Sequence, residues 1–163
     1  MHRCTASAPL ALTCALLFLA PRAQAQGRGQ GTLIVRPVQN LSFGSLLPGV
    51  PTTIDALDLA RSAQIEVKSL QGALFEIRFT LPSALTGAGA LLPLAFSSSS
   101  AGVSASSAPS TLVRFDPNYA ARFVFLTTNK VTFFLGGQAR PTGRQPIGTY
   151  SAPVVVTITN LGV

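Results

Sequence analysis

The acidic residues are the first candidates for chemistry, because a glycosidase needs a pair of carboxylates. The chain holds only five Asp and Glu residues, and Glu66 and Glu76 fall on the polar faces of two neighbouring predicted strands. Lys68 and Arg78 share those faces, so cross-strand ion pairing is a simpler interpretation than catalysis. We therefore assign no catalytic role to the two glutamates.

Two further constellations point to chemistry only weakly. Asp55 and Asp58 are close in sequence, but two apolar residues separate them, whereas a calcium loop clusters several oxygen ligands. A serine nucleophile would have to use Lys68 or Lys130 as its base, and both lie in or beside predicted strands, where surface solvation is the simpler role. The Gly-x-Ser-x-Gly motif of serine hydrolases is absent. The sequence thus predicts neither an enzyme nor a metal site.

The first 25 residues have the pattern of a secretory signal peptide. His2 and Arg3 are followed by an apolar run over residues 8–20 and by the small-x-small pattern Ala23-Gln24-Ala25. The run is too short for a membrane-spanning helix, which needs about 20 apolar residues. We expect a signal helix over residues 1–25, export to the periplasm, cell surface or medium, and a mature chain that is a single domain over residues 26–163.

Cleavage would remove Cys4, Cys14 and His2, the only cysteines and the only histidine. The mature chain would then have no disulfide, none of the usual zinc or copper ligands, and no histidine base. We predict no cofactor, and a fold held by burial and sheet hydrogen bonds alone.

The chain is basic, with a formal net charge of +7. A positive charge keeps an apolar β-protein soluble, and it also suits an anionic surface or glycan. Arg140 and Arg144, which flank Gly143, are the candidates for such a contact. The charges are scattered along an exported chain, so nucleic-acid binding is not expected.

Apolar residues alternate with polar ones in three segments. Ile65 and Val67 share one face of the first segment, and Phe75, Ile77, Phe79 and Leu81 share one face of the second. In the third, from Thr149 to Thr159, the shared face carries Val154, Val156 and Ile158. A period of two with polar residues on the other face is typical of half-buried antiparallel strands.

Other segments complete the pattern. We expect a first strand from Thr32 to Val38, with Pro37 at an edge, and a hairpin formed by Arg122–Leu126 and Val131–Leu135. Further short strands are predicted over 51–57 and 91–96. The serine-rich stretch 97–110 is predicted to be a long flexible loop or a loosely paired excursion, and 138–148 a polar loop. The prediction is an all-β, immunoglobulin-like antiparallel sandwich of seven to nine strands.

Several short motifs recur in this order along the chain. Leu41-Ser42-Phe43-Gly44 follows the first strand, Gly136-Gly137 ends a later one, and Gly148-Thr149-Tyr150-Ser151 precedes the terminal Val-x-Val-x-Ile strand. This pattern resembles the bacterial exported family catalogued as domain of unknown function 4402. It is more distantly similar to spore coat protein U and the archaic chaperone–usher pilins. The resemblance implies a structural role for Leu41, Phe43, Gly44, Gly136, Gly137, Gly148, Tyr150 and Ser151.

The chain departs from that family pattern at its end. Ala152-Pro153 follows Tyr150-Ser151 where the family usually has Gly, and the chain closes without an aromatic residue. Because Pro153 has no N–H to donate, we expect it to bend or shorten the last strand.

Two interpretations of function remain open. In the first, the protein is a pilin-like or surface-coat subunit that assembles by β-strand addition with itself or related subunits, and Leu33 and Val35 mark the strand to be exchanged. In the second, it is a self-complete binding module that contacts a glycan, an anionic surface or a protein. A first strand detached from its own domain would favour exchange, and a self-paired one would favour the module.

Overall fold

The computed structural model describes residues 33–69, 72–105, 112–124 and 129–162. They form twelve strands in three antiparallel sheets. In chain order these are β1 (Ile34–Gln39), β2 (Thr52–Ile54), β3 (Ala63–Lys68), β4 (Leu74–Thr80), β5 (Ala84–Gly87), β6 (Ala90–Ala95), β7 (Ala101–Ser104), β8 (Val113–Phe115), β9 (Ala121–Val124), β10 (Lys130–Leu135), β11 (Gly137–Ala139) and β12 (Val155–Gly162). The predicted all-β sandwich is confirmed, with more strands than expected; the predicted signal helix lies outside the described residues.

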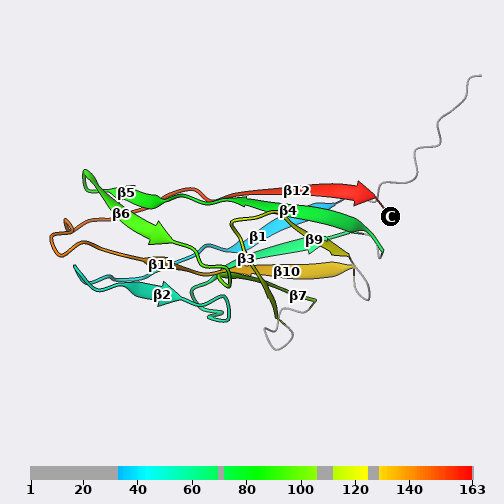
Figure 1. Cartoon of the computed structure of the whole chain (residues 1–163), viewed down its shortest axis with the longest axis horizontal. Coiled ribbons are helices and arrows are strands. Elements are labelled where there is room, and N and C mark those ends of the chain that lie inside the picture. The colour runs from blue at the N-terminus through cyan, green and yellow to red at the C-terminus, as the bar shows by residue number, and fades with distance from the viewer. Residues whose placement is uncertain (1–32, 70–71, 106–111, 125–128, 163) are drawn as a thin grey trace, which may run out of the picture.

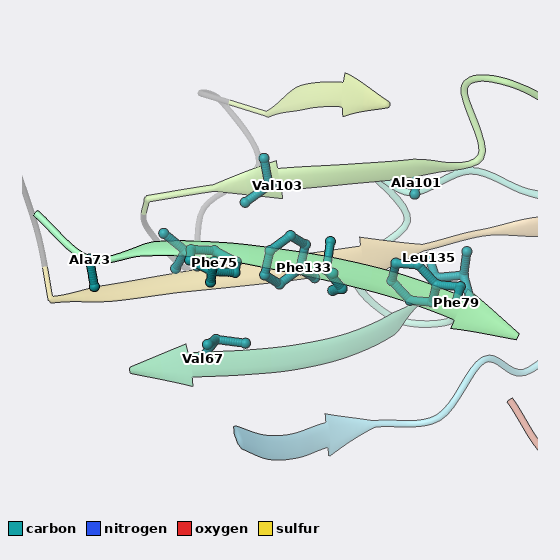
Figure 2. Close-up of a cluster of buried hydrophobic side chains, with 10 residues drawn as sticks. Val67, Ala73, Phe75, Phe79, Ala101, Val103, Phe133 and Leu135 are labelled. Atoms are coloured by element: carbon teal, nitrogen blue, oxygen red, sulfur yellow. The ribbon is translucent and has the colours of Figure 1, made fainter. Parts of the chain in front are cut away.

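Two sheets form the sandwich itself. One has the order β1-β3-β10-β7-β8 and the other has the order β12-β4-β9. The alternating segments supply its core: Phe75 and Ile77 of β4 are fully buried, as are Val67 of β3 and Phe133 of β10. Figure 2 shows Phe75 and Phe79 of β4 packed over Phe133 and Leu135 of β10. We call the ten buried residues of this cluster and the side chains packed against them the main core.

A third sheet extends the molecule beyond the sandwich. Its order is β2-β11-β6-β5, and it lies at the end of the elongated molecule opposite the C-terminus (Figure 1). Phe43, Ile54, Leu92 and Ala139 are buried there and form a smaller core. The molecule therefore has two cores along one axis.

Gly136 lies between β10 and β11, at the passage from the main core to the smaller one. A Cβ atom built on this residue would lie 2.2 Å from the carbonyl oxygen of Ile54 and 2.9 Å from the amide nitrogen of Ala56. Its own N–H donates to the carbonyl of Ser100 at 2.8 Å. Only glycine allows the backbones to approach this closely, which explains why the Gly136-Gly137 pair stands here.

The outer face of the five-stranded sheet is also covered. Phe134 points away from the main core, yet it is fully buried. It lies opposite Gly102 in the β10–β7 register, and a Cβ atom on Gly102 would collide with the side chain of Leu112. Leu112, which comes immediately before β8, therefore packs over this face, and a phenylalanine can be buried there.

Three sequence predictions about elements are wrong. The serine-rich stretch 97–110, predicted as a flexible loop or a loosely paired excursion, contains β7, which pairs with β10 and β8 and whose four residues are all buried. Gln138–Gly148, predicted as a polar loop, begins within β11. The hairpin predicted from Arg122–Leu126 and Val131–Leu135 does not form, because β9 pairs with β4 in one sheet and β10 pairs with β3 and β7 in the other.

The last strand begins later than predicted. β12 starts at Val155 rather than at Thr149 and runs to Gly162. Pro153 lies just before it, in agreement with the expected loss of a backbone donor. Val156 and Ile158 nevertheless face the main core, as the alternation predicted.

Candidate functional site

The predicted carboxylate pair is not assembled. Glu66 on β3 and Glu76 on β4 belong to different sheets, and each is held by two cations of its own sheet. Glu66 lies 3.2 Å from Lys68 and 3.0 Å from Lys130, whose hydrogen bonds lower the pKa of Glu66. Glu76 lies 3.0 Å from Arg122 and 3.8 Å from Arg78. The prediction that β3 and β4 pair was wrong: each glutamate has one cation on its own strand, and its second cation lies on β10 for Glu66 and on β9 for Glu76.

The aspartate pair and the two lysines are similarly engaged. Asp55 accepts two hydrogen bonds from Arg114, at 2.8 and 3.1 Å, and this interaction lowers the pKa of Asp55. Asp58 lies 2.7 Å from Arg61. The described residues include no group of three or more His, Cys, Asp or Glu side chains that could hold a metal ion. Among the described carboxylates, Asp55, Asp58, Glu66 and Glu76 pair with cations, and Asp116 accepts hydrogen bonds from Asn118.

A hollow of the described structure lies between β1 and the segment that leads into β12. It is a groove of about 1010 Å³. One wall carries Val35 and Pro37 of β1 with Ile65 of β3, and the other wall carries Val156 of β12 and Val154 before it. These strands are the edges of the two sandwich sheets on the same side of the molecule. The groove is therefore the place where the space between the two sandwich sheets opens to solvent.

The lining of the groove carries apolar side chains from both cores together with uncharged polar residues. Ile65 and Val156 pack against the main core, and Leu85 and Leu94 pack against the smaller one. Of the described residues that line it, none is charged, although the chain carries a net charge of +7. Burial in this groove would favour an uncharged segment with apolar side chains, because an unpaired charge is costly to desolvate.

β12 starts at the groove, which its residue Val156 lines, and the outer edge of the strand continues beyond it. It pairs with β4 along one edge, and no described strand pairs with the other. Its eight residues include no charge and no proline. Natural proteins usually protect a long edge strand with lysine, proline or a covering segment, because its free N–H and C=O groups template pairing with another chain. The residues before it are fixed to β5 by the Thr86–Ser151 bridge.

The first strand is paired within its own domain. β1 runs antiparallel to β3, with Val35 opposite Val67 and Pro37 opposite Ile65. Leu33 packs against the main core, and Val35 also lines the groove. Pro37 lies at the sheet edge, as the sequence predicted. A first strand paired within its own domain was expected to favour a self-complete module, and β1 meets that expectation. The groove beside β1 nevertheless stays open.

The motif residues gather at the far end of the molecule. Phe43 is buried in the smaller core, and Leu41 and Tyr150 pack against it. The hydroxyl of Tyr150 donates to the carbonyl of Pro146 at 2.8 Å. Ser151 exchanges two backbone hydrogen bonds with Thr86. The sequence placed these residues in a motif, and the structure gives them a common task, which is to build the third sheet and the end of the groove. The remaining members lie in the same region: Gly44, Gly136, Gly137 and Gly148.

The two candidate anion-binding arginines are exposed on the loop after β11. Nε of Arg140 donates to Gln138 at 2.6 Å, and Arg144 is solvent-exposed. No described carboxylate lies within ion-pair distance of either guanidinium, whereas Arg61, Arg78, Arg114 and Arg122 are all paired.

Sequence reasoning missed the groove, because its walls come from residues more than one hundred positions apart. One signal was present: the terminal segment Val155–Gly162 is long, β-forming and free of charge or proline. No protein-family model and no curated protein matches this chain. The described residues contain no helix with the length and apolarity needed to cross a membrane.

Proposed function

We propose that the protein is an exported, non-catalytic assembly subunit that accepts a β-strand from another subunit in the groove between β1 and β12. The occupant would be a segment in which every second residue is apolar, so that only uncharged side chains face the groove. Its main chain would pair with the edge of β12 that no described strand covers, and its apolar side chains would enter the groove. The donor is a second copy of this chain or a related subunit.

The observation that carries this proposal is the one-sided closure of the sandwich. Phe115 of β8 and Phe123 of β9 join the two sheets on one side, with ring centroids 5.2 Å apart. On the other side, β1 and β12 leave the groove of about 1010 Å³. A sandwich lacking one strand has this form, and a donated strand would supply the missing apolar contact. The similarity to pilin-like and spore-coat families points the same way.

The first test compares two substitutions on adjacent residues of β12. Val156→Arg places a charge on the groove wall, while Val155→Arg places the same charge on the exposed face of the same strand. We expect the purified protein and Val155→Arg to form heat-resistant oligomers on gels and in size-exclusion chromatography. Val156→Arg should weaken association roughly 100-fold or more, because an arginine cannot be buried there unpaired.

The alternative function, a self-complete binding module, rests on the pairing of β1 with β3. A peptide with the sequence of residues 32–38, added as a probe strand, distinguishes the two functions, because only a strand-accepting groove should bind it. Acceptance in the groove should stabilise the protein by about 2.7 kcal/mol at a peptide concentration of 100 times Kd, and Val156→Arg should abolish the effect. A protein that stays monomeric at all concentrations and ignores the peptide would exclude strand acceptance and leave the module.

A further inference from the structure

Three loops form an apolar tip at the end of the molecule opposite the C-terminus. Figure 1 shows the connections β1–β2, β5–β6 and β11–β12 gathered there. Ile147 of the third loop is fully exposed, at 100% relative exposure. Leu47 of the first loop is 69% exposed, and Leu91, which follows the second turn, is 63% exposed. Protruding aliphatic side chains gathered at one end of a molecule are candidates for a contact surface.

The three loops are held together as one surface. The N–H of Gly49 donates to the carbonyl of Thr142 at 3.0 Å and so joins the first loop to the third. The side chain of Gln145 is buried; its Nε2 donates to the carbonyl of Leu91 at 3.3 Å, and its Oε1 accepts from the N–H of Thr142 at 3.2 Å. The apolar side chains are therefore carried on loops of fixed relative position.

The charge of the tip has one sign. Segments 40–51, 87–91 and 140–150 contain Arg140 and Arg144 and no Asp or Glu, although the chain has five acids in all. Arg144 lies three residues before Ile147, and no described carboxylate neutralises either arginine. The tip thus combines protruding aliphatic side chains with uncompensated positive charge.

We propose that this tip docks on the surface of an anionic phospholipid bilayer. Ile147, Leu47 and Leu91 would enter the boundary between headgroups and acyl chains, and Arg144, with Arg140 behind it, would pair with lipid phosphates. A bilayer suits this surface better than a protein does, since it accepts isolated protruding aliphatic chains without a complementary shape. Protein interfaces instead centre on aromatic anchors in fitted pockets, and the ring of Tyr150, the one aromatic residue of the third loop, packs on the smaller core.

Vesicle binding tests the proposal, using liposomes of phosphatidylethanolamine with 30% phosphatidylglycerol against liposomes of phosphatidylcholine alone. We expect the protein to co-sediment with the anionic liposomes and to be released by 0.5 M salt. Arg144→Gln should weaken binding about fivefold, in line with the effect of one basic residue near an anionic surface. Ile147→Ser should weaken it at least tenfold. Neither side chain is buried, so both variants should fold normally.

Val155→Ser is the matched control, because Val155 is also an exposed aliphatic residue but lies on β12, away from the tip. It should bind like the parent protein. Equal binding to the two kinds of liposome, or an equal loss in Val155→Ser and Ile147→Ser, would overturn the proposal. The strand-acceptance assays contain no lipid, so failure of one proposal leaves the other standing.

Discussion

The two sides of the sandwich, where its two sheets end, are built in opposite ways. On one side β8 and β9 meet through an aromatic cluster: Phe115 and Phe123 contact each other, and both contact Phe133 with ring centroids 6.1 and 5.4 Å away. On the other side β1 and β12 present aliphatic side chains to an open groove. Large rings bridge a gap between sheets that valines leave open, so residue size at the edge strands decides which side is closed.

The edge strands themselves differ in the same sense. β8 and β9 are short and each carries an arginine in an ion pair, Arg114 with Asp55 and Arg122 with Glu76. β12 is eight residues long and carries no charge. The closed side has the features that prevent edge-to-edge pairing, and the open side lacks them on its longer strand. The comparison implies that the opening is a specific feature of one side rather than a general looseness of the fold.

The largest effect is expected from emptying the closed side. Phe133→Ala removes a fully buried ring that contacts Phe75, Phe115 and Phe123. It should lower the free energy of unfolding by about 3–5 kcal/mol, the usual cost of such a cavity. Urea denaturation followed by circular dichroism measures the loss. Val155→Ala, on the exposed face, should change stability by less than about 0.5 kcal/mol; a comparable loss in the two variants would contradict the assignment of the core.

A second substitution tests the junction between the two cores. Gly136→Ala would force a Cβ atom against the backbone of Ile54 and Ala56. We expect a loss of about 1–3 kcal/mol, because backbone atoms cannot move aside as a flexible side chain can. Gly143→Ala is the control, since a Cβ atom there meets nothing within 4 Å. Equal denaturation midpoints for the two variants would show that the junction tolerates a side chain.

The sequence predicted which faces of the strands are buried better than it predicted which strands become neighbours. Strict alternation over Phe75–Leu81 and over Val154–Ile158 correctly identified the faces that pack in the main core. Side-chain period depends only on local residues, which a single sequence displays. Which strands become neighbours depends on long-range pairing, and so β9 and β10 were wrongly joined as a hairpin.

β7 and the groove escaped prediction for physical reasons. β7 is built from Ala101, Gly102, Val103 and Ser104, and small residues give little propensity signal; their burial is decided by the neighbours β10 and β8. The groove arises from what is missing between β1 and β12, and no local pattern records a missing neighbour. The motif residues around Phe43 and Tyr150 were identified, but their common location became visible only in the fold.

A double-mutant cycle sharpens the comparison between the two sides directly. Phe115→Leu and Phe123→Leu, alone and together, should give a coupling energy of about 0.5–1.5 kcal/mol, as expected for an edge-to-face aromatic pair. The same cycle with Val35→Ala and Val156→Ala, across the groove, should give a coupling near zero in the monomer. Urea denaturation of all variants provides both numbers. Strong coupling across the groove would mean that β1 and β12 touch and that the open side is closed in solution.

The smallest expected effect separates the two sides by their response to pH. The hydrogen bonds from Arg114 lower the pKa of Asp55 from its ordinary value of 3.8, so the ionised carboxylate stabilises the folded state. This contribution is complete above the unfolded-state pKa and is lost as pH falls through the lower folded-state value. Because both side chains are partly solvated, it should amount to only about 0.2–1 kcal/mol at neutral pH.

Asp55→Asn should therefore be less stable than the parent by that amount at pH 7, and equally stable near pH 2. Arg114→Gln should behave in the same way, and 1 M salt should shrink both differences. Val156→Ala, in a groove lined by no carboxylate, should differ from the parent by the same amount at both pH values. If the difference in unfolding free energy between Asp55→Asn and the parent did not change with pH, the Asp55–Arg114 ion pair would contribute nothing to the stability of the side that carries β8.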